Sequence, residues 1–239
     1  SKKLKQYLGS SKCTIEYMRS MRSSVDRFNE REIPGLYALI IPSGGGKSTA
    51  AKEWGFLDID NIIGNQEAME KLVLARREMI RWGTNKWEEH NREWYDMVHS
   101  VLSRYNFEEK PNVILVHTEE MAFEVGATPL AALIPSKGLH NARLGNRNEL
   151  ERILAVDNLR IVENRTKSVD VYTYNTWQEL EQYLACLVWD VMEIPAPFRA
   201  FKKKPENGWP AGYGEDVPMW VMQGRISDDV DIKVVEKLF

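Results

Sequence analysis

The chain has 239 residues, 43% hydrophobic and 28% charged, which is enough to bury a sizeable core and is ordinary for a globular protein. Its net charge of −3 excludes a general positive field for nucleic acid or an anionic membrane, although a local basic groove remains compatible with it. No apolar run approaches the roughly 18 residues that span a bilayer, so no membrane partner is expected. Two distant cysteines, Cys13 and Cys186, indicate free thiols in a reducing, cytoplasmic compartment.

The spacing of apolar residues predicts one helix at 12–31, followed by alternating strands and helices. Residues 36–41 form a short continuous apolar run, as in a buried parallel strand, and a glycine-rich loop follows. Such an alternation implies a parallel sheet that is covered by helices on both faces. We expect the later strands at 56–60, 112–117, 130–134 and 169–174. We expect the later helices at 47–54, within 65–107 as a pair, at 146–158, and after residue 175.

The loop after the first strand lies within "IIPSGGGKSTAAKEWGFLDID", residues 40–60. Glycines let successive backbone N–H groups approach an anion, and the N-terminus of the following helix adds a partial positive charge. A lysine at this position reaches the β- and γ-phosphates of a nucleotide, and the next hydroxyl binds Mg²⁺. The sequence therefore predicts a phosphate loop made of Ser43, Gly44, Gly45, Gly46, Lys47, Ser48 and Thr49.

The segment "IPSGGGKSTAAKEWGFLDIDNII" resembles the P-loop kinase branch of the P-loop NTPases, which includes shikimate, gluconate and polynucleotide 5′-kinases. Those loops read like GPSGSGKST, and an aspartate, often as D-x-D, ends the strand after the first helix. The resemblance covers about residues 35–192 by the order of strands and helices and is specific within 40–60. Ile41 replaces the first glycine of the pattern, and the first helix is shorter. Right-handed crossovers and a phosphate loop at the central strand favour the strand order 2-3-1-4-5 in a three-layer fold.

The resemblance assigns roles by position. Lys47 would bind the β- and γ-phosphates, Ser48 would bind Mg²⁺, and Thr49 would touch the α-phosphate. Asp58 would hold the metal through water, and Asp60 would orient and partly deprotonate an acceptor hydroxyl. Phosphoryl transfer depends mainly on in-line positioning and on neutralising charge, which these residue types can supply.

Two further segments correspond to moving or substrate-binding parts of such kinases. Residues 136–158 would form a lid, in which Arg143 and Arg147 neutralise developing charge, and the alternative is a solvated basic loop. Residues 65–108 would hold the phosphate acceptor. Their arginines and tryptophans could form a platform that binds nucleic-acid bases, and the alternative is that the tryptophans belong to the core. The residues concerned are Arg76, Arg77, Arg81, Arg92, Trp82, Trp87 and Trp94.

Weaker candidates lie after the third predicted strand and just before the fifth. His117 and Glu119 could take part in catalysis, but Glu119 and Glu120 equally suit the first turn of a helix. Arg165 and Lys167 lie where such folds receive adenine.

These features predict a Mg²⁺- and ATP-dependent kinase, using ATP or another NTP, that phosphorylates a hydroxyl of a small molecule, a nucleotide or a nucleic-acid end. The short first helix and the missing glycine keep open a P-loop nucleoside triphosphatase module in a larger protein or assembly. A degenerate, non-catalytic interaction domain is the third interpretation. The expected organisation is a helical extension at 1–34, a kinase-like domain at 35–194 and a Pro- and Gly-rich extension at 195–239.

Overall fold

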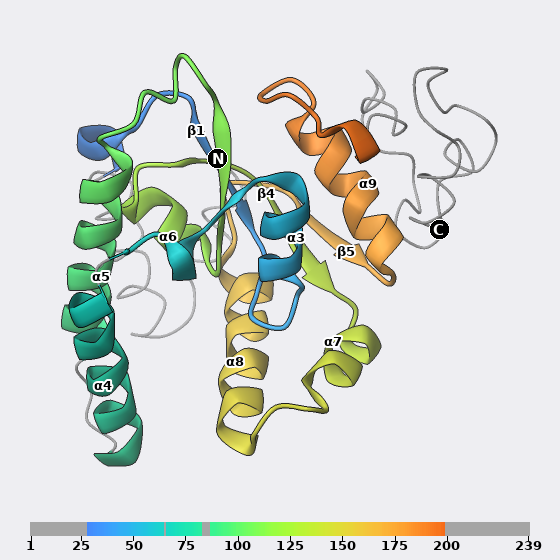
Figure 1. The fold of residues 1–239 in the computed structure, drawn as a ribbon. Helices are drawn as coiled ribbons and strands as arrows, with labels where there is room; N and C mark the ends of the chain where they lie inside the picture. Colours follow the sequence, from blue (N-terminus) through green and yellow to red (C-terminus); the bar gives the residue numbers. More distant parts are fainter. Residues whose placement is uncertain (1–27, 65, 83–86, 199–239) are drawn as a thin grey trace, which may run out of the picture.

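A five-stranded parallel sheet forms the centre of the computed structural model, which describes residues 28–64, 66–82 and 87–198 (Figure 1). The strand order is β2-β3-β1-β4-β5, and every pairing between neighbouring strands is parallel. The α/β class, the parallel sheet and the order 2-3-1-4-5 predicted from the sequence are therefore confirmed. The strands are β1 (Leu36–Ile40), β2 (Leu57–Asp58), β3 (Asn112–Val116), β4 (Thr128–Pro135) and β5 (Val171–Tyr174).

The central strand β1 is buried between β3 and β4. It pairs with β3 without a shift, from Leu36 opposite Asn112 to Ile40 opposite Val116. Both strands read as continuous apolar runs because helices cover both faces of the sheet. Since parallel strands end at the same edge, the loop after Ile40 meets the residue that follows Val116.

Helices of very different lengths connect the strands. Side-chain oxygens of Thr118, Ser136, Asn148 and Thr176 each accept a backbone N–H and so fix where four of them begin. The cap at Asn148 explains why the helix expected at 146–158 begins at Glu149. The α-helices are α3 (Lys47–Trp54), α4 (Gln66–Trp82), α5 (Trp87–Leu102), α6 (Glu119–Glu124), α7 (Lys137–Leu144), α8 (Glu149–Arg165) and α9 (Trp177–Val188).

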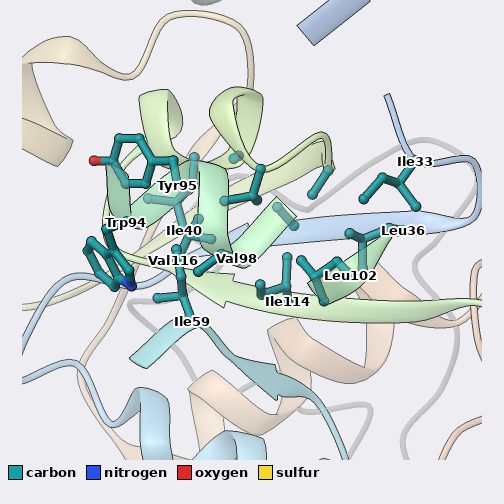
Figure 2. Close-up of a cluster of buried hydrophobic side chains, with 14 of the residues drawn as sticks. Ile33, Leu36, Ile40, Ile59, Trp94, Tyr95, Val98, Leu102, Ile114 and Val116 are labelled. Atoms are coloured by element: carbon teal, nitrogen blue, oxygen red, sulfur yellow. The ribbon is translucent and has the colours of Figure 1, made fainter. Parts of the chain in front are cut away.

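Two hydrophobic clusters pack on opposite faces of the sheet. One cluster joins Leu36, Ile40 and Val116 to Trp94 of α5 (Figure 2). Leu159 of α8 belongs to the same cluster. The other joins alternate residues of the same strands to α3 and α9. The alternation of side chains along a strand produces this division, and the result is a three-layer arrangement. The members of the second cluster in contact with α3 and α9 include Leu39, Leu115, Trp54, Tyr183 and Leu184.

The predicted second strand, 56–60, is shorter in the structure. Asp58 ends β2, and its side chain accepts the backbone N–H of Asp60, which turns the chain into a 3₁₀ helix at Ile59–Asn61. This local hydrogen bond competes with the strand ladder. A second 3₁₀ helix spans Ala196–Phe198.

Several expectations lie outside the described residues. They include most of the helix at 12–31, of which 28–31 are helical, and the extension after residue 198. Cys13 also lies outside, whereas Cys186 is buried. The domain boundaries stay predictions. In the described part of the chain, no helix combines the length and apolar character needed to cross a membrane.

Candidate functional site

The glycine-rich loop leaves the carboxyl end of β1 and enters α3. Gly44 and Gly46 have φ of 82° and 92°, in the left-handed region that disfavours side chains, and Gly45 N–H donates to Pro42 O at 2.8 Å. A Cβ on Gly46 would lie 2.6 Å from the ring of Trp177. The glycines are thus required both for the turn and for the close approach of α9.

Three side chains from two later elements, α7 and β5, hold the loop carbonyl oxygens. His140 Nε2 donates to Ser43 O at 2.8 Å. Arg143 Nη1 donates to Gly45 O at 2.9 Å, and the Tyr174 hydroxyl donates to the same oxygen. Carbonyl oxygens repel an anion, so binding them to α7 and β5 favours a loop that presents N–H groups to a phosphate.

Lys47, at the start of α3, lies between two carboxylates. Its Nζ donates to Asp58 Oδ1 and, at 2.6 Å, to Asp60 Oδ2. Lys47 and Asp58 are 6% and 5% exposed, so this ion pair is buried. Ser48 Oγ donates to the other oxygen of Asp58 at 2.9 Å, which places a hydroxyl and a carboxylate side by side.

Asp60 connects the loop to the end of β3. His117 Nε2 donates to both Asp60 oxygens, at 3.2 and 3.0 Å. Burial opposes ionisation of Asp60, but the hydrogen bond from His117 and the charges of His117 and Lys47 outweigh it. The pKa of Asp60 is therefore held well below its usual range. The carboxylate stays ionised at neutral pH, and its side chain is 41% exposed.

The two arginines predicted to form a lid contact the loop directly. Arg143 holds Gly45 O and lies over the rings of Tyr174 and Trp177, at 5.8 and 5.6 Å. Arg147 Nη1 donates to Ser43 Oγ at 3.2 Å. The structure therefore brings together, around one loop, all the residues predicted for the site except Thr49, which is exposed on α3 without a described partner in the site.

Some weaker candidates lie elsewhere. Glu119 begins α6 and accepts backbone N–H groups of Lys167 and Ser168, so its carboxylate is satisfied within the fold. Trp94 is buried in the core, whereas Trp82 is 68% exposed, with Arg81 over its ring at 5.1 Å.

Sequence reasoning missed four residues that support the loop: His140, Asn158, Tyr174 and Trp177. Asn158 accepts Ser43 N–H at 2.7 Å and donates to His117 O at 3.2 Å, which joins the ends of β1 and β3. These residues come from distant elements, and the only clue in the sequence is that Tyr174 ends a predicted strand and Trp177 begins the next helix.

The donor atoms at the loop suit a hard cation that arrives with a phosphate ligand. Ser48 Oγ and Asp58 supply oxygen ligands, and Mg²⁺ is commonly bound by one or two carboxylates together with substrate phosphates. Among the described residues, no group of three or more His, Cys, Asp or Glu side chains could hold a metal by itself. The fit is therefore to a metal shared with a ligand.

Comparisons with known proteins show one clear relative. Over 234 residues the chain is 30% identical to an RNA-directed RNA polymerase of Penicillium chrysogenum virus (isolate Caston/2003). The match covers 97% of this chain and 20% of the viral protein, so the chain spans about a fifth of the length of the relative. No family model matches the chain, and no solved structure matches it.

These findings correct the interpretation of the glycine-rich segment. The assignment to the P-loop kinase branch is wrong: the relative is an RNA polymerase, which transfers nucleotidyl groups, and no kinase family matches. The predicted phosphotransferase function fails with it, and the nucleoside triphosphatase alternative is not supported. The physical reason for the error is that a strand, a glycine turn and a lysine at a helix start encode anion binding in general, not one reaction.

Proposed function

We propose that these residues bind a ribonucleoside triphosphate together with Mg²⁺, as part of an enzyme that synthesises RNA on an RNA template. The similarity to an RNA-directed RNA polymerase supports the reaction class, because such enzymes use nucleoside triphosphates and Mg²⁺. The observation that supports the binding site is the position of Lys47 at the start of α3, between two carboxylates and directly after a glycine loop whose carbonyl oxygens are held by other side chains.

The balance of charge explains why the metal and the nucleotide would bind together. Two carboxylates, Asp58 and Asp60, face one ammonium group, so a triphosphate alone would meet net negative charge. Mg²⁺ on Ser48 and Asp58 would neutralise this charge. Lys47 could then exchange a carboxylate for the β- or γ-phosphate, while Arg143 and Arg147 supply positive charge on the other side of the loop.

Binding of a fluorescent ribonucleoside triphosphate, measured with and without Mg²⁺, tests this proposal. Lys47→Ala should weaken binding at least tenfold, about 1.4 kcal/mol, because a phosphate loses its charge partner. Lys52→Ala is the matched control, since Lys52 is exposed on the same helix, and it should bind like the wild type. Equal affinity in Lys47→Ala and wild type, or binding that is indifferent to Mg²⁺, would overturn the site.

A further inference from the structure

The apolar stripe of α4 continues past the part of the helix that is covered. Leu72 and Met79 are 3% and 5% exposed, whereas Trp82, which follows Met79 along the same stripe, is 68% exposed. Trp82 has the largest exposed fraction among the large hydrophobic side chains in the described part of the chain. Because burying an indole is strongly favourable, a ring that its own helix leaves in solvent is available to a partner.

The end of α4 that carries Trp82 lies at the same end of the sheet as the glycine-rich loop. α4 and α5 form a helical hairpin, in which Arg76 of α4 lies over the ring of Trp94 of α5. The chain after α5 returns to the start of β1, where Phe107 O lies against Gly35. The C-terminal end of α4 is therefore at the opposite, carboxyl end of the strands, and Figure 1 shows it projecting past them on the side of the loop.

Two arginines accompany the exposed indole. The guanidinium of Arg81 lies over the Trp82 ring, 5.1 Å from the centroid, and Arg77 is exposed one turn before Arg81. Residues four apart lie on the same side of a helix, so both positive charges are close to the ring. Neither guanidinium forms an ion pair with a carboxylate in the described part of the chain. Both charges are therefore available to an anionic ligand.

An exposed ring beside unpaired arginines suits a ligand that combines flat rings with phosphates. Every base of a single-stranded nucleic acid has a face that can stack on an aromatic side chain, and every linkage carries a negative charge. In a duplex the base faces are covered by the neighbouring base pairs, so a stacking contact of this kind selects a single strand. The similarity to an RNA-directed RNA polymerase favours RNA as the polymer.

We propose that Trp82, Arg81 and Arg77 form a docking platform for single-stranded RNA at the end of α4. Trp82 stacks on a base, and the two arginines bind the phosphates on either side of it. This inference rests on the proposed function, because the polymerase similarity selects RNA: neither stacking nor a phosphate contact distinguishes ribose from deoxyribose. Single-stranded DNA of the same length should therefore bind the platform with similar affinity.

The test is fluorescence anisotropy of a short oligouridylate, labelled at its 3′ end, with the full 239-residue chain at several salt concentrations. Trp82→Ala should weaken binding about tenfold and leave the salt dependence unchanged, since stacking is not ionic. Arg81→Gln and Arg77→Gln should each weaken binding. Each should also lower the slope of log affinity against log salt concentration by about 0.7, the value for one phosphate contact in a single strand.

The matched control is Arg104 with Tyr105, an exposed arginine followed by an aromatic residue, at the other end of the helical hairpin. Tyr105 is 63% exposed, close to the value for Trp82. Arg104→Gln and Tyr105→Ala should each change RNA affinity less than about twofold. Trp82→Phe keeps a ring that can stack and should retain most of the affinity, whereas Trp82→Leu keeps only an apolar side chain and should lose as much as Trp82→Ala. Thermal unfolding shows whether each variant is folded.

Several results would overturn the platform. They are a wild type that does not bind the oligomer, equal affinities of wild type and Trp82→Ala, and equal losses for Trp82→Ala and Tyr105→Ala. A duplex RNA provides a further check, because Trp82→Ala should leave its affinity nearly unchanged. An equal loss for the duplex and the single strand would exclude base stacking. If Trp82→Phe binds as weakly as Trp82→Leu, the ring is not the binding group, and contact with a protein becomes the better use of this surface.

The two proposals fail separately. Trp82→Ala should bind Mg²⁺ and nucleoside triphosphate like the wild type, because Trp82 makes no described contact with the loop. Lys47→Ala should bind the oligomer like the wild type. If Lys47→Ala leaves triphosphate binding unchanged, the proposed function fails at the loop whatever the RNA measurements show. If triphosphate binding depends on Lys47 while RNA binding does not depend on Trp82, only the platform fails.

Discussion

Lys47 and Asp58, eleven residues apart, form a buried ion pair at the carboxyl end of the sheet. The pair joins the first turn of α3 to the end of β2, and Ser48 shares the same carboxylate. Burying two charges is costly, and their attraction and hydrogen bonds must compensate for the lost hydration. Such a pair contributes little stability as a whole, yet each partner is costly to remove alone.

Removing only Lys47 should destabilise the protein strongly. Lys47→Met should lower the free energy of unfolding by about 3–5 kcal/mol, because Asp58 is then buried without its partner. The double variant Lys47→Met, Asp58→Asn removes both charges and keeps an acceptor for Ser48, so it should recover most of that loss. Urea unfolding of the two variants and the wild type provides the measurement. A double variant less stable than Lys47→Met would contradict this account.

The two aspartates should differ in how they affect the metal. Asp58 adjoins Ser48 Oγ, whereas Asp60 is bound to His117. Asp58→Asn should raise the Mg²⁺ concentration required for triphosphate binding by about tenfold, since a neutral amide is a poorer ligand for a hard cation. Asp60→Asn should change that requirement little. Titrations of Mg²⁺ at a fixed nucleotide concentration measure the Mg²⁺ requirement of both variants. An equal increase in the two variants would show that Asp58 and Asp60 do not differ in their role toward the metal.

The sheet could be predicted because its signals are local. The runs at 36–40 and 113–116 are continuous and apolar, Gly35 and Pro111 lie just before the two strands, and right-handed crossovers leave few possible strand orders. Lys47, Ser48 and Asp58 could be found for the same reason, since Lys47 and Ser48 come shortly after the first predicted strand and Asp58 lies near the end of the second. The end of β2 could not, because the hydrogen bond from Asp60 N–H to the Asp58 side chain decides it.

The side chains that hold the glycine-rich loop could not be predicted, because they are distant from the loop in sequence. Asn158 lies 115 residues from Ser43, and Tyr174 lies 129 residues from Gly45. Nothing in the local pattern around either residue indicates a contact with the loop. The reaction class also escaped the sequence pattern, because anion binding at a helix start serves many chemistries, and only the similarity to a polymerase overturned the kinase interpretation.

Two glycines that flank α3 offer a matched test of the loop. Gly46 and Gly55 both have left-handed φ, 92° and 72°, so alanine at either position is strained by about 1–2 kcal/mol. A Cβ on Gly46 would also meet Trp177 at 2.6 Å, whereas a Cβ on Gly55 would meet nothing within 4 Å. Gly46→Ala should therefore be the less stable variant and should bind triphosphate more weakly, while Gly55→Ala should bind like the wild type. Thermal unfolding and nucleotide titration measure this, and identical behaviour of the two variants would refute the role of the Trp177 contact.

Glu181 of α9 should make stability depend on pH near neutrality. The residue is 1% exposed, its Oε1 accepts from Trp177 Nε1 at 2.8 Å, and its Oε2 is buried without a partner in the described residues. Burial raises the pKa of Glu181 to about 7, and the charge of Glu53 adds to the rise, whereas the bond from Trp177 opposes it.

The folded state therefore binds this proton more tightly than the unfolded state, in which the pKa of a glutamate is near 4.5. Stability should fall as pH rises between those two pKa values and should stay lower above them.

Glu181→Gln keeps an acceptor for Trp177 and cannot ionise. It should match the wild type near pH 4 and exceed it near pH 8 by on the order of 2 kcal/mol, since one pKa unit corresponds to about 1.4 kcal/mol. Urea unfolding at several pH values measures the difference, with exposed Glu53→Gln as the control that should shift the profile only slightly. Parallel pH profiles for Glu181→Gln and wild type would show that Glu181 is not held protonated in the fold.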